Sequence, residues 1–112
     1  MHTTSETIKI ENYTPEFCFI IEQNRFMEIN KNPHMYAEFI DSLKMEIFEN
    51  IHISTEDEME FVSQIDYALN MIDCEFKLPE IFEKQIIVKK ENGNIYILSF
   101  KKTEVPVPCR QY

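Results

Sequence analysis

Three histidines and three cysteines are the residues of this sequence that could bind a metal ion or act as a catalytic nucleophile and base. They are His2, His34, His52, Cys18, Cys74 and Cys109. None is paired with another at helical spacing or at the short Cys-x-x-Cys type of spacing that zinc sites use. We therefore expect no metal site and no cofactor, and we interpret the imidazoles as unconnected surface or boundary groups.

A cysteine nucleophile requires a thiolate that a histidine or another positive group activates. Cys74 lies between Asp73 and Glu75 instead, and two adjacent negative charges are an unfavourable setting for a thiolate. A phosphate-binding loop requires several glycines, whereas this chain contains one, Gly93. We therefore expect that the protein is not an enzyme.

Negatively charged residues, by contrast, are concentrated in one segment of the sequence. Residues 45–76 hold nine of the 20 acidic residues and none of the 11 lysines and arginines. Acids and bases balance elsewhere, so this window supplies the whole formal net charge of −9. Such a field repels nucleic acid and anionic membranes. We expect a basic protein as the partner, such as a nuclease or a nucleic-acid-binding protein, and no direct contact with nucleic acid or membrane.

Six residues of this window are the candidate partner-binding residues. They are Glu56, Asp57, Glu60, Asp66, Tyr67 and Asp73. The carboxylates would steer the partner and pair with its arginines and lysines, and Tyr67 would be a central anchor. Met59 and Met71 lie among these acids, and Met and Tyr are typical of adaptable contact surfaces.

An ordinary solvated helix face is the other interpretation of the acidic window. Carboxylates in a first helical turn are stabilised by about 0.3–1 kcal/mol through the helix dipole, so acids there are common. Exposed helices usually alternate Lys with Glu at i,i+4, however, and this window contains no lysine. The one-signed charge favours a contact surface.

The whole chain, residues 1–112, is predicted to form a single domain. A chain of 112 residues with 44% hydrophobic content can bury one core without the help of disulfide bonds or bound metal ions. Residues 103–112 contain two prolines and are predicted to be an extended or disordered tail. An odd cysteine count, no secretion signal and no long apolar run indicate a cytoplasmic protein.

We predict an α+β fold, with two amphipathic helices packed on a small antiparallel sheet. Asn32 and Pro33 are typical of a helix cap and first turn, and an apolar stripe follows them. A second helix is predicted to start at Thr55, where Thr55-x-x-Glu58 has the spacing of a capping box. The two stripes are Tyr36, Phe39, Ile40, Leu43, Ile47 and Ile51, and then Phe61, Val62, Ile65, Ala68, Leu69 and Ile72.

A C-terminal β-hairpin is predicted for residues 85–100. Asn92-Gly93 provides the two positive φ angles of a type I′ turn, which would pair Val88 with Ile97 and Ile87 with Leu98. Four lysines would then charge the exposed edges of the sheet against aggregation. They are Lys89, Lys90, Lys101 and Lys102.

The remaining segments give weaker signals. Residues 7–11 alternate like a short strand, and residues 78–82 are predicted to form a helical turn. Residues 14–30 fit either a helix that starts at Thr14-Pro15 or a pair of buried strands around Gln23-Asn24. We favour the strands, because the apolar residues of this segment point all round a helical wheel.

Two helices lying side by side would merge their outer faces into one acidic patch with apolar anchors. We therefore predict a small acidic inhibitor that blocks a basic, nucleic-acid-handling protein. In size, charge and compartment the chain is similar to acidic bacterial immunity proteins that neutralise nuclease toxins, and to phage-encoded antagonists of host defence such as anti-CRISPR proteins. The alternative is a structural or regulatory subunit that assembles through the hairpin edge or as a homodimer. The sequence leaves its oligomeric state open.

Overall fold

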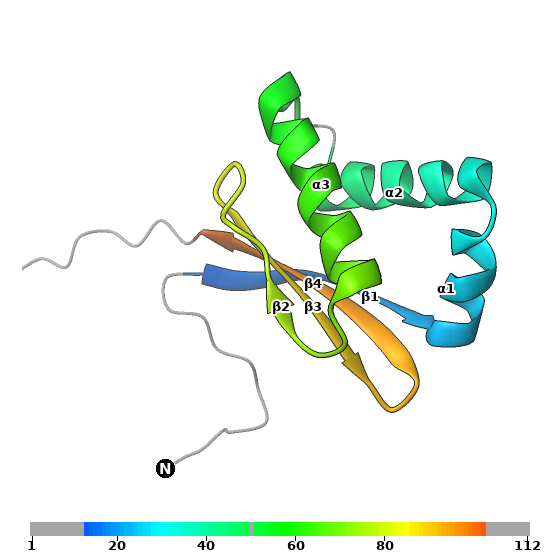
Figure 1. Ribbon diagram of the computed structural model, residues 1–112. Helices are drawn as coiled ribbons and strands as arrows, with labels where there is room; N and C mark the ends of the chain where they lie inside the picture. Colours follow the sequence, from blue (N-terminus) through cyan, green and yellow to red (C-terminus); the bar gives the residue numbers. More distant parts are fainter. Residues whose placement is uncertain (1–12, 50, 103–112) are drawn as a thin grey trace, which may run out of the picture.

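Three helices lie on one side of a four-stranded antiparallel sheet (Figure 1). The computed structural model describes residues 13–49 and 51–102. The elements are β1 (Tyr13–Glu22), α1 (Gln23–Asn30), α2 (Pro33–Phe48), α3 (Thr55–Met71), β2 (Phe76–Lys77), β3 (Lys84–Glu91) and β4 (Asn94–Lys102). This confirms the predicted α+β class, with one helix more than expected. The strand predicted for residues 7–11 and the tail predicted for residues 103–112 lie outside the described residues.

The C-terminal hairpin has the predicted turn and register. Asn92 and Gly93 have φ angles of 54° and 79°, and Val88 pairs with Ile97 while Ile87 pairs with Leu98. Asn and Gly are the residues that adopt left-handed φ angles at least steric cost. A local signal of two residues was therefore enough to fix the register of two long strands.

The hairpin lies inside the sheet, where an edge was predicted. The strand order is β1-β4-β3-β2, so β4 has a neighbour on both sides and β3 pairs with β2 at Phe76–Lys77. Lys101 and Lys102 on β4 therefore do not lie at a free edge as predicted, because both pair with β1. Lys89 and Lys90 lie on β3 beyond the two residues that pair with β2. Lys90 instead reaches the helix layer and donates to the Leu69 carbonyl at 2.7 Å, and Lys89 pairs with Glu91 at 3.0 Å.

Residues 14–30 form one strand and one helix. The prediction of a strand is correct for β1, but residues 25–29 form α1 and not a second strand. The side chains of Phe26 and Ile29 are buried at helical spacing. The Phe26 ring lies 6.3 Å from Tyr36 and 5.9 Å from Phe39, between ring centroids. Packing against α2 therefore selects the helix, which the local sequence left open.

The two predicted helices are present, and one of the two predicted caps is correct. Asn32 caps α2 by accepting hydrogen bonds from the backbone N–H groups of His34 and Met35 at 3.0 and 3.1 Å. The cap of α3 is Ser54, whose Oγ accepts from the Asp57 N–H at 3.0 Å, so the predicted Thr55 capping box is wrong by one residue. Glu58 consequently faces α2 and not its own helix end.

Residues 78–82 do not form the predicted helical turn. Ile81 and Lys84 exchange two backbone hydrogen bonds of 3.1 and 2.8 Å across a tight turn. Its central residues, Phe82 and Glu83, have left-handed φ angles of 49° and 61°, which is unfavourable for residues with a Cβ atom. Leu78 and Ile81 are buried, so the packing of this segment determines the turn against the preference of its residues.

The core lies between the helices and the sheet. Phe61, Ile65, Ala68 and Leu69 of α3 are buried, as the predicted stripe requires, whereas Val62 is exposed. Phe48 at the end of α2 meets Phe61 edge to face, with 5.6 Å between ring centroids. Each such buried side chain contributes roughly 1.5–3 kcal/mol to folding. In the part of the chain that is described, no helix is both long and apolar enough to cross a membrane.

Candidate functional site

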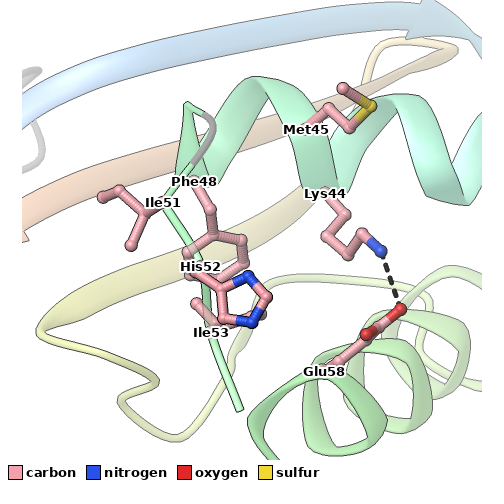
Figure 2. A pocket seen from close by; sticks show the side chains of 7 residues that line it. All are labelled: Lys44, Met45, Phe48, Ile51, His52, Ile53 and Glu58. Atoms are coloured by element: carbon pink, nitrogen blue, oxygen red, sulfur yellow. Dashed lines mark hydrogen bonds and ion pairs between the residues drawn. The ribbon is translucent and has the colours of Figure 1, made fainter. Parts of the chain in front are cut away.

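Helices α2 and α3 cross, and a cleft lies where they separate. Figure 1 shows α2 and α3 on the same side of the sheet and inclined to each other, and the contacts of Tyr36 with Asp66 and of Lys44 with Glu58 join the two helices. A hydrogen-bonded ion pair spans the cleft, with the Lys44 Nζ 2.7 Å from Glu58 Oε2 (Figure 2). The same ammonium lies 3.4 Å from Asp41 Oδ1. Two carboxylates thus share one ammonium.

Two hollows flank this ion pair, and both include Lys44 and Glu58 in their walls. The larger, of about 340 Å³, we call the Tyr36 hollow. Its lining residues are Tyr36, Ala37, Ile40, Asp41, Lys44, Glu58 and Val62. The smaller, of about 210 Å³, we call the Phe48 hollow. Its lining residues are Lys44, Met45, Phe48, Ile51, His52, Ile53 and Glu58 (Figure 2).

The ion pair of the cleft lies partly in solvent. The Lys44 side chain is 24% exposed and that of Glu58 is 45% exposed. The hydrogen bond to Glu58 raises the pKa of Lys44; burial acts in the opposite direction, and the bond to Asp41 adds to the increase. Lys44 therefore stays charged at neutral pH, and the three groups together carry one net negative charge.

One side of α3 faces α2 and is tied to it. We call Glu58, Val62, Asp66 and Asn70 the inner flank, because residues four apart share one side of a helix. The Tyr36 hydroxyl donates to Asp66 Oδ1, and the Asn70 side-chain amide donates to the same oxygen at 3.0 Å. Burial, followed by the hydrogen bond to Asp66, raises the pKa of Tyr36.

The inner flank also reaches α1. The Asn30 side-chain amide donates to Asn70 Oδ1 at 2.9 Å. A chain of side-chain hydrogen bonds therefore links the end of α1, the first turn of α2 and the second half of α3. Such a network holds the relative positions of the three helices, because each polar group has a defined partner.

A second side of α3, turned away from α2 and from the core, faces solvent. We call Glu56, Glu60, Tyr67 and Met71 the outer flank. Within residues 13–49 and 51–102, neither glutamate carboxylate makes a hydrogen bond or an ion pair, and both residues are exposed. Met71 is 69% exposed and Tyr67 is 45% exposed. The Tyr67 ring packs edge to face on Phe76, with 5.3 Å between centroids, which fixes its position while leaving one side in solvent.

Three of the six predicted partner-binding residues come together on the outer flank, namely Glu56, Glu60 and Tyr67. Asp66 lies on the inner flank, because consecutive helical residues diverge by roughly 100°, and its carboxylate is already engaged by Tyr36.

The other two predicted residues lie at the ends of α3. Asp57 is half-buried in the first turn, where its N–H bonds to the Ser54 cap. Asp73 is exposed beyond the C-terminal end of α3, and its charge partly offsets the burial that lowers the pKa of Lys90.

Three residues of the cleft were missed by the sequence analysis. They are Lys44, Asp41 and Tyr36 in its role as a hydrogen-bond donor. The sequence does contain a signal for Lys44, since it lies four residues after Ile40 and four before Phe48. A lone cation in such a row indicates a group that needs a carboxylate from a neighbouring element.

Metal-binding and thiol groups are sparse in the described residues. No cluster of three or more His, Cys, Asp or Glu side chains is placed there to hold a metal ion. Cys18 and Cys74 are free and exposed. The polar groups described in the cleft and on the inner flank of α3 are carboxylates, the Lys44 ammonium, the Tyr36 hydroxyl, the His52 imidazole and the Asn70 amide.

Comparisons with protein-family models, curated proteins and solved structures gave no match to this chain.

Proposed function

We propose that this protein is a non-enzymatic inhibitor that binds a basic, nucleic-acid-handling protein and covers its positive surface. The observation that carries the proposal is the outer flank of α3, where Glu56 and Glu60 are exposed and without a partner among the described residues. The acids of the inner flank already have internal partners. The outer carboxylates are free to meet the arginines and lysines of a second protein.

Exposed apolar groups beside these carboxylates support a contact surface. Tyr67 and Met71 expose large parts of their side chains on the same flank, two to three helical turns after Glu60. Tyr supplies contact area at low entropic cost, and Met adapts to irregular partners. Charge would speed the encounter by roughly 10 to 10³ at low salt, and the apolar groups would then hold the complex.

The partner's class follows from the sign of the field. A protein that handles nucleic acid carries a positive groove, and an acidic ligand that covers this groove competes with the nucleic acid. Both an immunity protein against a nuclease toxin and a phage antagonist of host defence would act in this way. The cysteines are odd in number and widely spaced, which supports the cytoplasm as the compartment.

Kinetic measurements on charge-reversal variants test the proposal. The partner is first identified by affinity capture from the source cell, and its inhibition is measured with purified proteins. The double variant Glu56→Lys with Glu60→Lys is expected to slow association at least several-fold at about 0.05 M salt and much less at about 0.5 M. Inhibition of the partner should weaken in parallel.

Glu22→Lys with Glu83→Lys is the matched control. Both residues are exposed and lie outside α3, at the end of β1 and in the turn before β3. Neither side chain makes a hydrogen bond or an ion pair among the described residues, and the change in net charge is the same. We expect this control to slow association far less. Equal slowing by both double variants would show that only net charge matters, and would contradict the outer flank as the binding surface.

A further inference from the structure

The cleft between α2 and α3 has a regular chemical pattern along its α2 wall. Ile40, Lys44 and Phe48 follow one another at intervals of four residues, so they lie on one side of the helix. Ile40 lines the Tyr36 hollow, Phe48 lines the Phe48 hollow, and Lys44 lies between the two. At 1.5 Å per residue, the two apolar positions are about 12 Å apart along the helix axis.

The charge at the centre of the cleft is not balanced. Among the residues that the structure describes, Lys44 is the one base in contact with both Asp41 and Glu58, and the Asp41 side chain remains 62% exposed. An ammonium is a point charge, whereas a guanidinium can bind a carboxylate through two parallel hydrogen bonds. An added guanidinium would therefore find a carboxylate oxygen available on either side of Lys44.

We propose that the cleft binds a helical segment of the partner in which an arginine is flanked by large apolar residues four positions before and four positions after it. The arginine pairs with Asp41 and Glu58, and the two apolar side chains enter the Tyr36 and Phe48 hollows. Eight residues of helix span about 12 Å, which matches the separation of Ile40 and Phe48. This inference rests on the proposed function, because it specifies which part of a basic partner is recognised.

The walls of the cleft favour a helix over an extended peptide. The Tyr36 hollow is lined by helices, whose backbone groups are already hydrogen-bonded, so it offers no strand edge for pairing. The Phe48 hollow is lined by both helices and by Ile51–Ile53 of the segment that joins them. An extended ligand would leave its own N–H and C=O groups unpaired against apolar side chains, which is unfavourable. A helix satisfies its backbone internally and presents residues at i, i+4 and i+8 on one side.

Charge decides between ligands of similar shape. A segment with an acid at the central position would meet Asp41 and Glu58 and be repelled. A wholly apolar segment would remove the Lys44–Glu58 pair from water without adding a hydrogen bond, at a net cost. An arginine adds hydrogen bonds to the carboxylates and neutralises the remaining charge.

A synthetic peptide provides the probe. The peptide is alanine-rich and helical, with Leu, Arg and Leu at positions i, i+4 and i+8. In the matched control, citrulline replaces the arginine and keeps its shape without its charge. Binding to the full-length protein is measured by fluorescence anisotropy and by backbone amide chemical shifts. We expect the arginine peptide to bind at least ten-fold more tightly than the citrulline peptide, and to shift amides around Ile40, Lys44 and Glu58.

Substitutions in the protein test whether the peptide binds in the cleft. Ala37→Arg fills the Tyr36 hollow from an exposed position on α2, and is expected to weaken binding of the arginine peptide at least ten-fold. Glu58→Gln keeps the shape of the side chain and should weaken the arginine peptide but not the citrulline peptide. Glu22→Lys, at an exposed position at the end of β1, should change peptide binding less than two-fold.

Several results would overturn the inference. Absence of arginine-peptide binding, equal binding of both peptides, or shifts confined to the outer flank would each contradict it. Binding measurements with the partner protein distinguish failure of this inference from failure of the proposed function. If Glu56→Lys with Glu60→Lys weakens the partner complex while Ala37→Arg leaves it unchanged, the inhibitor proposal stands and the cleft is not its recognition site.

Discussion

The inner and outer flanks of α3 carry the same chemical groups and use them differently. Each flank has two carboxylates, Glu58 and Asp66 on the inner side and Glu56 and Glu60 on the outer side. The inner pair meets Lys44 and Tyr36 from α2. The outer pair has no such partner among the described residues. Inner carboxylates therefore contribute to folding, and outer carboxylates are available for recognition.

This difference shows that an acidic helix cannot be assigned one role from its composition. Consecutive residues of a helix point in directions roughly 100° apart, so the neighbours Asp66 and Tyr67 lie on different flanks. The position of α2 decides which carboxylates are engaged. Substitutions on the two flanks should accordingly separate stability from binding.

Loss of Asp66 should have the largest effect on stability. Asp66→Ala removes the acceptor for Tyr36 and Asn70, and is expected to lower the free energy of unfolding by about 1.5–3 kcal/mol, as for a hydrogen bond to a charged group. Glu60→Ala on the outer flank should change it by less than about 0.5 kcal/mol. Urea denaturation of both variants measures the difference, and equal losses would remove the distinction between the flanks.

Tyr36→Phe should destabilise the protein by about 1–2 kcal/mol at neutral pH, because the hydrogen bond to Asp66 is lost. The pKa of Tyr36 is raised in the folded protein, so its contribution is complete below the unfolded pKa near 10 and declines as pH rises above that value. The stability gap between wild type and Tyr36→Phe should therefore narrow above pH 10. Unfolding measured from about pH 8 to 11 tests this, and a gap that widens would contradict it.

Glu58→Gln should have a smaller effect, because the ion pair with Lys44 is partly in solvent. We expect a loss of about 0.5–1 kcal/mol that shrinks in high salt. Glu56→Gln is the matched change on the outer flank and should alter the helix dipole interaction by at most a few tenths of a kcal/mol. Thermal unfolding at low and high salt distinguishes the two, and a salt-independent loss for Glu58→Gln would argue against an ionic contribution.

Glu60→Lys should show the smallest change in stability, and in the opposite direction. The new lysine lies four residues after Glu56, the favourable order for a helical ion pair, and is expected to add about 0.2–0.5 kcal/mol. Association with the partner should nevertheless slow several-fold. Calorimetric unfolding and association kinetics on one sample measure both effects. A variant that is more stable and binds normally would show that the outer flank is not used.

Local signals in the sequence predicted those parts of the fold that local interactions determine. Asn92-Gly93 fixed the hairpin register, and Asn32-Pro33 fixed the start of α2. The turn at Phe82-Glu83 could not be predicted in this way, since neither residue favours a left-handed φ angle and each costs about 1–2 kcal/mol there. The burial of Leu78 and Ile81 and the backbone hydrogen bonds between Ile81 and Lys84 stabilise it.

The candidate site was predictable in part for the same reason. Counting charges located the acidic window, and helical periodicity identified the core side of α3. The direction from which α2 approaches depends on the order of strands and on α1, whose helix is stabilised by Phe26 packing on Tyr36 and Phe39. The cleft, its two hollows and the engagement of Asp66 follow from that approach, so they required the structure.

The pairing of β1 with β4 determines the order in which this chain can fold. Tyr13 lies opposite Lys102, so β1 is synthesised long before its partner strand exists. Phe19 and Ile21, which are half-buried, gain their partners across the sheet, Ile97 and Ile95, only when β4 has been made. Contacts so distant in sequence slow folding. A nascent chain that stalls before residue 94 would leave both β1 and β3 without the strand that pairs with each of them. Its exposed apolar side chains and unpaired strand edges would then be accessible to chaperones and proteases.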